Sequence, residues 1–161
     1  MLYLLFQIGN DRYALEAGRA VEVIPFLALK QIPQAPRGVA GIFNYHGQPV
    51  PALDLCALTS GRPAREQLST RIILVKYSDP TDRPGSSGLL GLVAEHATEM
   101  MRRDERDFMD AGVKVGAAPY LGPVIMDDQG VIQLLHAQHL LAEGVRELLL
   151  APTSDVGGVE P

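Results

Sequence analysis

Short apolar runs, each broken by turn residues, recur along the 161-residue chain. Apolar runs of this length between clusters of Gly, Pro, Asn and Asp are typical of β-strands joined by turns. The runs that predict strands cover residues 2–8, 13–15, 20–24, 39–44, 70–77 and 88–101, and residues 121–135 predict a hairpin with Gly130 in its turn. The pattern therefore predicts a fold that consists mainly of β-structure.

Two of these runs, and a further predicted strand that contains Pro49 and Pro51, carry more information. Pro49 and Pro51 stand two apart in a predicted strand, so their missing N–H donors face the same side and leave one edge without a full ladder. The run at 70–77 is continuous and β-branched, which predicts a strand buried on both faces. The run at 88–101 is expected to kink near Glu95.

The segments between the strands predict turns, one brief helical turn and one terminal helix. Leucines at helical spacing predict a helix that closes the fold, and the absence of apolar periodicity after it predicts a disordered tail. These segments are a helical turn at 54–63, a solvated loop at 78–87, a surface connection at 102–120, the helix at 137–150 and the tail at 151–161. Residues 1–150 are therefore expected to form one domain.

Composition and charge exclude several classes of protein. With 16 glycines and 12 prolines, the chain has more turn residues than a helical bundle tolerates. The net charge is −5 without a lysine- and arginine-rich block, so nucleic acid is not an expected partner. The apolar start has no basic segment before it and is broken at Gln7 and Gly9, which argues against a signal peptide or membrane span. The single Cys56 cannot form an internal disulfide, consistent with a reducing cytoplasm.

A few side chains could in principle carry chemistry. His46 and Asp54 could act as a base and the acid that orients it, but no Gly-x-Ser-x-Gly turn supplies a nucleophile, and Cys56 lies in an apolar segment. His136 and His139 could share a helical face, yet no further ligand follows at the spacing of a zinc site. We expect no metal, no cofactor and no catalysis. A small ligand-binding or hydrolytic barrel using His46 and Asp54 remains the alternative.

Six segments, in order from residue 4 to about residue 142, resemble the CheW family, the coupling proteins of bacterial chemosensory arrays. They read LFQIGNDRYAL, AVEVIP, IPQAPRGVAGIFNYHGQPVPALDL, TRIILVKY, LLGLVAEHATEM and YLGPVIMDDQGVIQLLHAQHLL. The third segment is the most specific, because it joins a Pro-x-x-Pro connector to VAGIFN, a turn that ends in glycine, and PVPALDL.

The resemblance implies an all-β fold of two SH3-like, five-stranded β-barrels that share a core, followed by a short C-terminal helix. It also implies a non-catalytic adaptor that couples the cytoplasmic tip of a methyl-accepting chemoreceptor to the regulatory domain of a CheA-type histidine kinase. Such a protein would lie in the cytoplasm and be recruited to receptor arrays at the membrane without inserting into it.

The resemblance also implies a receptor-binding surface. Matching to the receptor-facing strands of the family places it on Ala20, Glu22, Val39 and Gly41, and the hairpin tip adds His46. These five positions are the predicted site residues.

The hairpin tip departs from the pattern usual in the family. CheW-like proteins usually have Asn-x-Arg-Gly here, whereas this chain has Asn44-Tyr45-His46-Gly47. Asn44 and Gly47 are expected to set the turn and His46 to lie at its tip. Because histidine is mostly neutral at pH 7 and arginine always charged, the matching partner surface is expected to differ. With two further departures, small residues at Ala17 and Ala20 and unusual residues at Ala94-Glu95 and His136, this departure indicates a divergent coupling protein, and a surface-sensing pathway of the Wsp type is one candidate.

Overall fold

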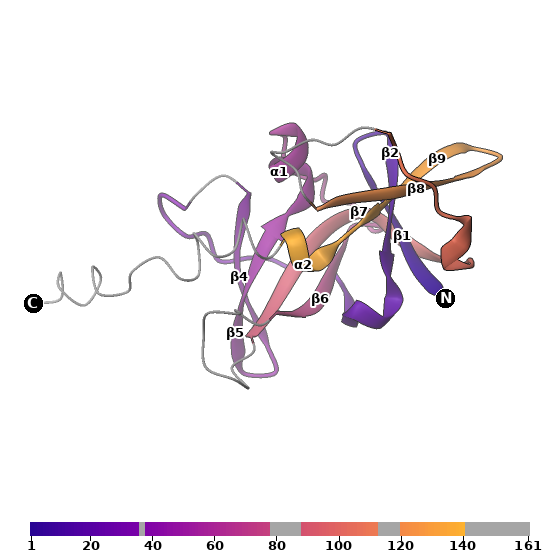
Figure 1. Cartoon of the computed structure of the whole chain (residues 1–161). Helices are drawn as coiled ribbons and strands as arrows, with labels where there is room; N and C mark the ends of the chain where they lie inside the picture. The colour runs from indigo at the N-terminus through magenta and orange to yellow at the C-terminus, as the bar shows by residue number, and fades with distance from the viewer. Residues whose placement is uncertain (36–37, 78–87, 113–119, 141–161) are drawn as a thin grey trace, which may run out of the picture.

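The computed structural model describes residues 1–35, 38–77, 88–112 and 120–140. Within these ranges the chain forms nine β-strands, two short α-helices and two 3₁₀ helices (Figure 1). The strands are β1 (Leu2–Ile8), β2 (Asp11–Glu16), β3 (Ala20–Pro25), β4 (Val39–Tyr45), β5 (Gln48–Asp54), β6 (Arg71–Tyr77), β7 (Gly88–Arg102), β8 (Leu121–Asp127) and β9 (Gly130–Leu135). The helices are η1 (Ala17–Arg19), α1 (Leu55–Ser60), η2 (Glu105–Asp107) and α2 (Ala137–Leu140).

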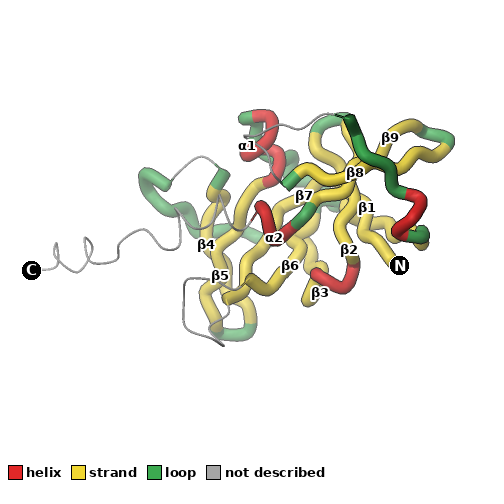
Figure 2. The backbone as a smooth tube through the Cα atoms, in the orientation of Figure 1, coloured by secondary structure: helices red, strands yellow, loops and turns green. Residues whose placement is uncertain are grey.

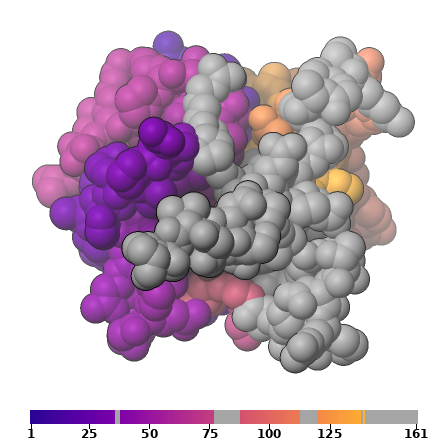
Figure 3. Space-filling model, turned by 90° about the vertical axis from the view of Figure 1, so that its left-hand side faces the viewer, coloured from indigo at the N-terminus to yellow at the C-terminus, as the bar shows by residue number. Residues whose placement is uncertain are grey.

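The strands form two five-stranded sheets that share β7 (Figure 2). In the first barrel the order is β3-β6-β7-β5-β4, and in the second barrel it is β7-β1-β2-β9-β8. All neighbours are antiparallel except the β5–β7 and β2–β9 pairs, which are parallel. The predicted fold of two five-stranded barrels is confirmed. The space-filling view shows segments of the first barrel gathered on one side of the molecule (Figure 3).

Strand β7 belongs to both barrels because it bends midway. Its residues 88–94 pair with β6, whereas from Glu95 onward it pairs with β1. His96, directly after the change of partner, has a φ of +51°. This left-handed conformation is uncommon for a residue with a side chain and redirects the strand. The predicted kink near Glu95 is confirmed.

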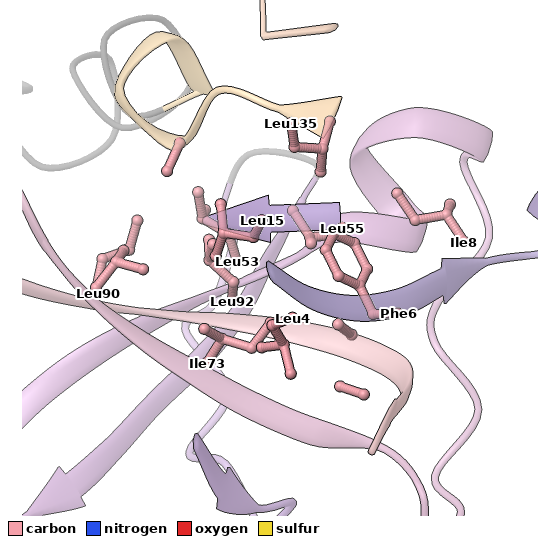
Figure 4. Packing of buried hydrophobic residues seen from close by; sticks show 14 of the residues in the cluster. Leu4, Phe6, Ile8, Leu15, Leu53, Leu55, Ile73, Leu90, Leu92 and Leu135 are labelled. Carbon is pink, nitrogen blue, oxygen red and sulfur yellow. The ribbon is translucent and has the colours of Figure 1, made fainter. Parts of the chain in front are cut away.

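One hydrophobic cluster joins the two barrels (Figure 4). Its buried members come from β1, β2 and β9 of the second barrel, from β5 and β6 of the first, from the shared β7 and from the two short α-helices. They include Leu4, Phe6, Leu53, Ile73, Leu92 and Leu135. Two smaller clusters lie within the individual barrels. Residues 72–75 of β6 are at most 1% exposed, as predicted for a strand buried on both faces. Separating the barrels would expose this shared cluster to water, so they form one core.

The two prolines of β5 act as the sequence predicts. The amide and carbonyl groups of Ile42 bond to Lys30, at 2.9 and 2.8 Å, and therefore point away from β5. Pro51, opposite Ile42, consequently has its missing donor on the side that faces β7. Pairing with β7 begins only at Ala52, directly after this position.

The connections agree with the sequence in part. The predicted helical turn at 54–63 is α1, and residues 121–135 form the β8–β9 hairpin with Gly130 at a φ of +124°. The surface connection at 102–120 contains η2 and a bridge from Met109 to Val124. Only the start of the predicted terminal helix, α2, is described, and the loop at 78–87 and the tail at 151–161 lie outside the described residues. The end of the domain at residue 150 stays a prediction. No helix among the described residues is long and apolar enough to cross a membrane.

Candidate functional site

The site begins where the two outermost strands of the first barrel meet. Strands β3 and β4 stand at opposite ends of its strand order, so they are not paired along their lengths. A side-chain hydrogen bond nevertheless joins them, because the Tyr45 hydroxyl donates to Glu22 Oε1 over 2.6 Å. The curvature of the sheet thus brings together two residues that are 23 positions apart in the chain.

The β4–β5 hairpin presents His46 at its tip. The strands end at the Tyr45–Gln48 pair, which leaves His46 and Gly47 as a two-residue loop. Their φ values are +51° and +86°, and a type I′ turn requires positive φ at both positions. The Gly47 amide donates to Asn44 Oδ1 over 2.7 Å and fixes the turn. The prediction that Asn44 and Gly47 set this turn, with His46 exposed at its tip, is confirmed.

Two of the predicted site residues lie at the margin of the core. Ala20 and Val39 are half-buried and pack against the cluster shared by the barrels. Their side chains therefore stabilise the fold and offer little surface to a partner. Whether a receptor contacts them stays a prediction.

Gly41 is buried and serves close packing. Its φ is +147°, and a Cβ atom there would lie 2.5 Å from the carbonyl oxygen of Lys30. This is far inside the normal contact distance and involves backbone, which cannot move as a flexible side chain can. A side chain at Gly41 would push away the segment that covers β4.

Two exposed residues next to Glu22 were not among the predicted site residues. Val21 and Val23, which flank Glu22 on β3, are 45% and 38% exposed. Tyr45 was also missed, although it directly precedes His46. The available signal was the composition of β3, where valines alternate with polar or small residues in a strand that ends at a proline.

The structure separates His46 from Asp54, so the interpretation of these two residues as a catalytic pair is wrong. Six residues of β5 lie between the turn and Asp54, which corresponds to roughly 20 Å of extended chain. The Asp54 carboxylate accepts bonds from the amides of Cys56, Ala57 and Ala64, at 2.9, 3.2 and 2.8 Å. Asp54 is therefore the N-cap of α1 and holds the following loop.

The remaining candidates for chemistry are not assembled into a site. The rings of His136 and His139 lie 5.6 Å apart, and no three potential metal ligands come together in the described part of the chain. Burial raises the pKa of the Cys56 thiol to about 11, which keeps it protonated and unreactive. At the surface, the bond to Glu22 raises the pKa of Tyr45, because it stabilises the protonated phenol.

Comparison with known proteins gives consistent results. The family described as the CheW-like domain matches residues 2–145. A chemotaxis protein CheW from Helicobacter pylori is 23% identical over 105 residues, which cover 65% of this chain. The match covers 59% of the length of that relative. The crystal structure of the scaffolding protein TtCheW from Thermoanaerobacter tengcongensis superposes with a TM-score of 0.75 at 21% identity and covers 92% of both chains.

Proposed function

The chain belongs to the CheW-like family, and on this premise we propose that it is a non-catalytic adaptor in a bacterial chemosensory array. In this role it couples the cytoplasmic tip of a methyl-accepting chemoreceptor to the regulatory domain of a CheA-type histidine kinase. It works in the cytoplasm, beneath receptors that reside in the membrane, without inserting into the bilayer or binding nucleic acid.

The observation that carries this proposal is the family match over residues 2–145, together with the two-barrel fold. The arrangement of polar groups supports the same conclusion. Asp54 is the acidic residue closest in sequence to His46, and its carboxylate accepts hydrogen bonds from three backbone amides. An arrangement of this kind stabilises a loop, so the Asp54 carboxylate is not available to orient His46 as a base.

We place the receptor contact on the first barrel, at Glu22 and His46 with the margin formed by Ala20, Val39 and Gly41. Glu22 and His46 are exposed, whereas Ala20 and Val39 are half-buried and Gly41 is buried. The kinase contact is expected to pair barrel with barrel, because the regulatory domain of CheA-type kinases resembles this fold. Contacts of modest area are individually weak, so we expect micromolar affinities.

Direct binding measurements test the proposal. The full chain is titrated by calorimetry with a receptor-tip fragment and, separately, with a CheA-type regulatory domain. Binding to both, and a ternary assembly when all three are mixed, is the expected result. If neither partner binds and native mass spectrometry instead finds a small molecule on the chain, the alternative of a ligand-binding barrel replaces the proposal.

The replacement His46→Arg tests the hairpin tip. It restores the residue usual in the family and adds a full charge at an exposed position. A partner surface matched to histidine should bind the variant less tightly, while the melting temperature stays within a few degrees of wild type. Unchanged affinity for both partners would remove His46 from the interface.

A further inference from the structure

The edge strand that carries Glu22 also has exposed apolar side chains. β3 is the terminal strand of its sheet and pairs with β6 alone. Val21 and Val23 expose 45% and 38% of their surface on either side of Glu22 along this strand. Edge strands with exposed apolar residues are unusual unless something covers them or pairs with them.

Tyr45 restrains the Glu22 carboxylate without neutralising it. A phenol hydroxyl donates one hydrogen bond but carries no positive charge, so Glu22 keeps its full negative charge. The bond occupies Oε1. The ion pairs found in the described part of the chain involve Asp127, Glu16 and Asp104, and Glu22 takes part in none of them.

A long side chain on an exposed strand would ordinarily sample several rotamers, and ordering it on binding costs free energy. The bond from Tyr45 removes part of that cost before the partner arrives. It also joins the end of the hairpin to β3, because Tyr45 directly precedes His46. Both effects favour a partner that places a positive charge at one defined position.

We propose that Tyr45 is a positioning residue of the receptor-binding surface, where it holds Glu22 to accept a lysine or arginine of the receptor. The inference rests on the proposed function and names the chemistry of the segment that the same site binds. Charge-assisted bonds of this kind set orientation and specificity more than total affinity.

The hydrogen bond itself can be tested without any partner. In ¹³Cζ-tyrosine NMR spectra recorded against pH, Tyr45 is assigned by the loss of its signal in Tyr45→Phe. The pKa of Tyr45 is expected to fall in Glu22→Gln, because the charged acceptor is gone. An identical titration of Tyr45 in wild type and Glu22→Gln would overturn the inference.

The effect on binding is measured with the receptor-tip fragment and the full chain. Tyr45→Phe, which removes one oxygen atom, is expected to weaken binding about threefold to tenfold, the usual effect of having to order one long side chain on binding. Glu22→Gln should weaken it more and reduce its sensitivity to salt. Because Tyr45 acts through Glu22, adding Tyr45→Phe to Glu22→Gln should cause no further loss. Replacing the matching basic residue of the receptor fragment by Gln should weaken its binding to wild type but have little effect on its binding to the Glu22→Gln variant.

Controls separate this inference from the proposed function. Tyr13→Phe makes the same chemical change on β2 of the second barrel and should leave receptor affinity unchanged. Melting temperatures confirm that each variant is folded. If wild type binds the receptor fragment and Tyr45→Phe binds it equally well, the inference fails and the adaptor function stands. If wild type binds neither receptor nor kinase domain, the proposed function itself fails.

Discussion

Replacing Asp54 by alanine should destabilise the fold strongly and locally. Asp54 is only 7% exposed, and its two carboxylate oxygens accept three backbone hydrogen bonds. Two of these bonds, from Cys56 and Ala57, cap the first turn of α1. The third, from Ala64, fixes the chain after the helix, where it turns back toward β6. Alanine removes all three acceptor contacts and supplies none.

The magnitude follows from these contacts. Loss of an N-cap side chain costs about 1 kcal/mol, with a range of about 0.5 to 2 kcal/mol. The amide of Ala64 then lacks its acceptor, and such a group costs about 1–3 kcal/mol where water cannot reach it. Because Ala64 is half-buried, we take the lower part of that range. The sum is about 2–3 kcal/mol, which lowers the melting temperature of a domain of this size by roughly 4–12 °C.

Thermal and urea unfolding of wild type, Asp54→Ala and Asp54→Asn provide the assay. Asparagine keeps one acceptor oxygen but turns an NH₂ group toward an amide donor. The loss of stability in Asp54→Asn should therefore lie between zero and that in Asp54→Ala. Asp128→Ala, at an exposed position of the β8–β9 turn, is the control for removing a carboxylate. A fall of less than about 1 kcal/mol in Asp54→Ala would refute the reasoning, because the three bonds would then be replaced by water at little cost.

Three further predictions concern a surface ion pair, the cysteine and a buried glycine. The bidentate hydrogen bond from Arg12 holds the pKa of Asp127 well below its usual range. The pair therefore stabilises the fold at pH values above the ordinary carboxyl pKa of about 3.9, and this stabilisation is lost as the pH falls below that value. The difference in melting temperature between wild type and Arg12→Gln should therefore narrow below about pH 4, and a constant difference would contradict this. Cys56 should react with thiol reagents slowly in the native protein and rapidly in denaturant at pH 8, because burial raises its pKa to about 11. Gly41→Val should lower the melting temperature more than Gly47→Ala. Both glycines have positive φ, but only at Gly41 would the added Cβ lie 2.5 Å from a backbone oxygen. An equal fall would mean that the backbone around Gly41 shifts to accept the side chain at little cost.

Much of the fold could be predicted because local sequence carries it. A continuous β-branched run marked β6 as a strand buried on both faces, and paired prolines marked the side of β5 that could not donate. The pairing of distant segments could not be read in this way. β1 and β2 begin the chain, yet they complete the barrel to which β8 and β9 belong. The parallel pairing of β2 with β9 has no recognisable pattern in the sequence of either strand. Such partners are chosen by burial of the shared core, which depends on the whole chain.

The residues that meet at the site could not be identified from their spacing in the sequence either. His46 and Asp54 were considered together because they are eight positions apart, yet an extended strand moves its ends apart by about 3.3 Å per residue. Tyr45 and Glu22 are 23 positions apart and meet at 2.6 Å, because the first barrel curves until its outer strands approach each other. Two residues at opposite ends of one strand, such as His46 and Asp54, are therefore too far apart to share a site. Residues that can act together are found where the ends of different strands meet, and here that place is the tip of the β4–β5 hairpin beside β3.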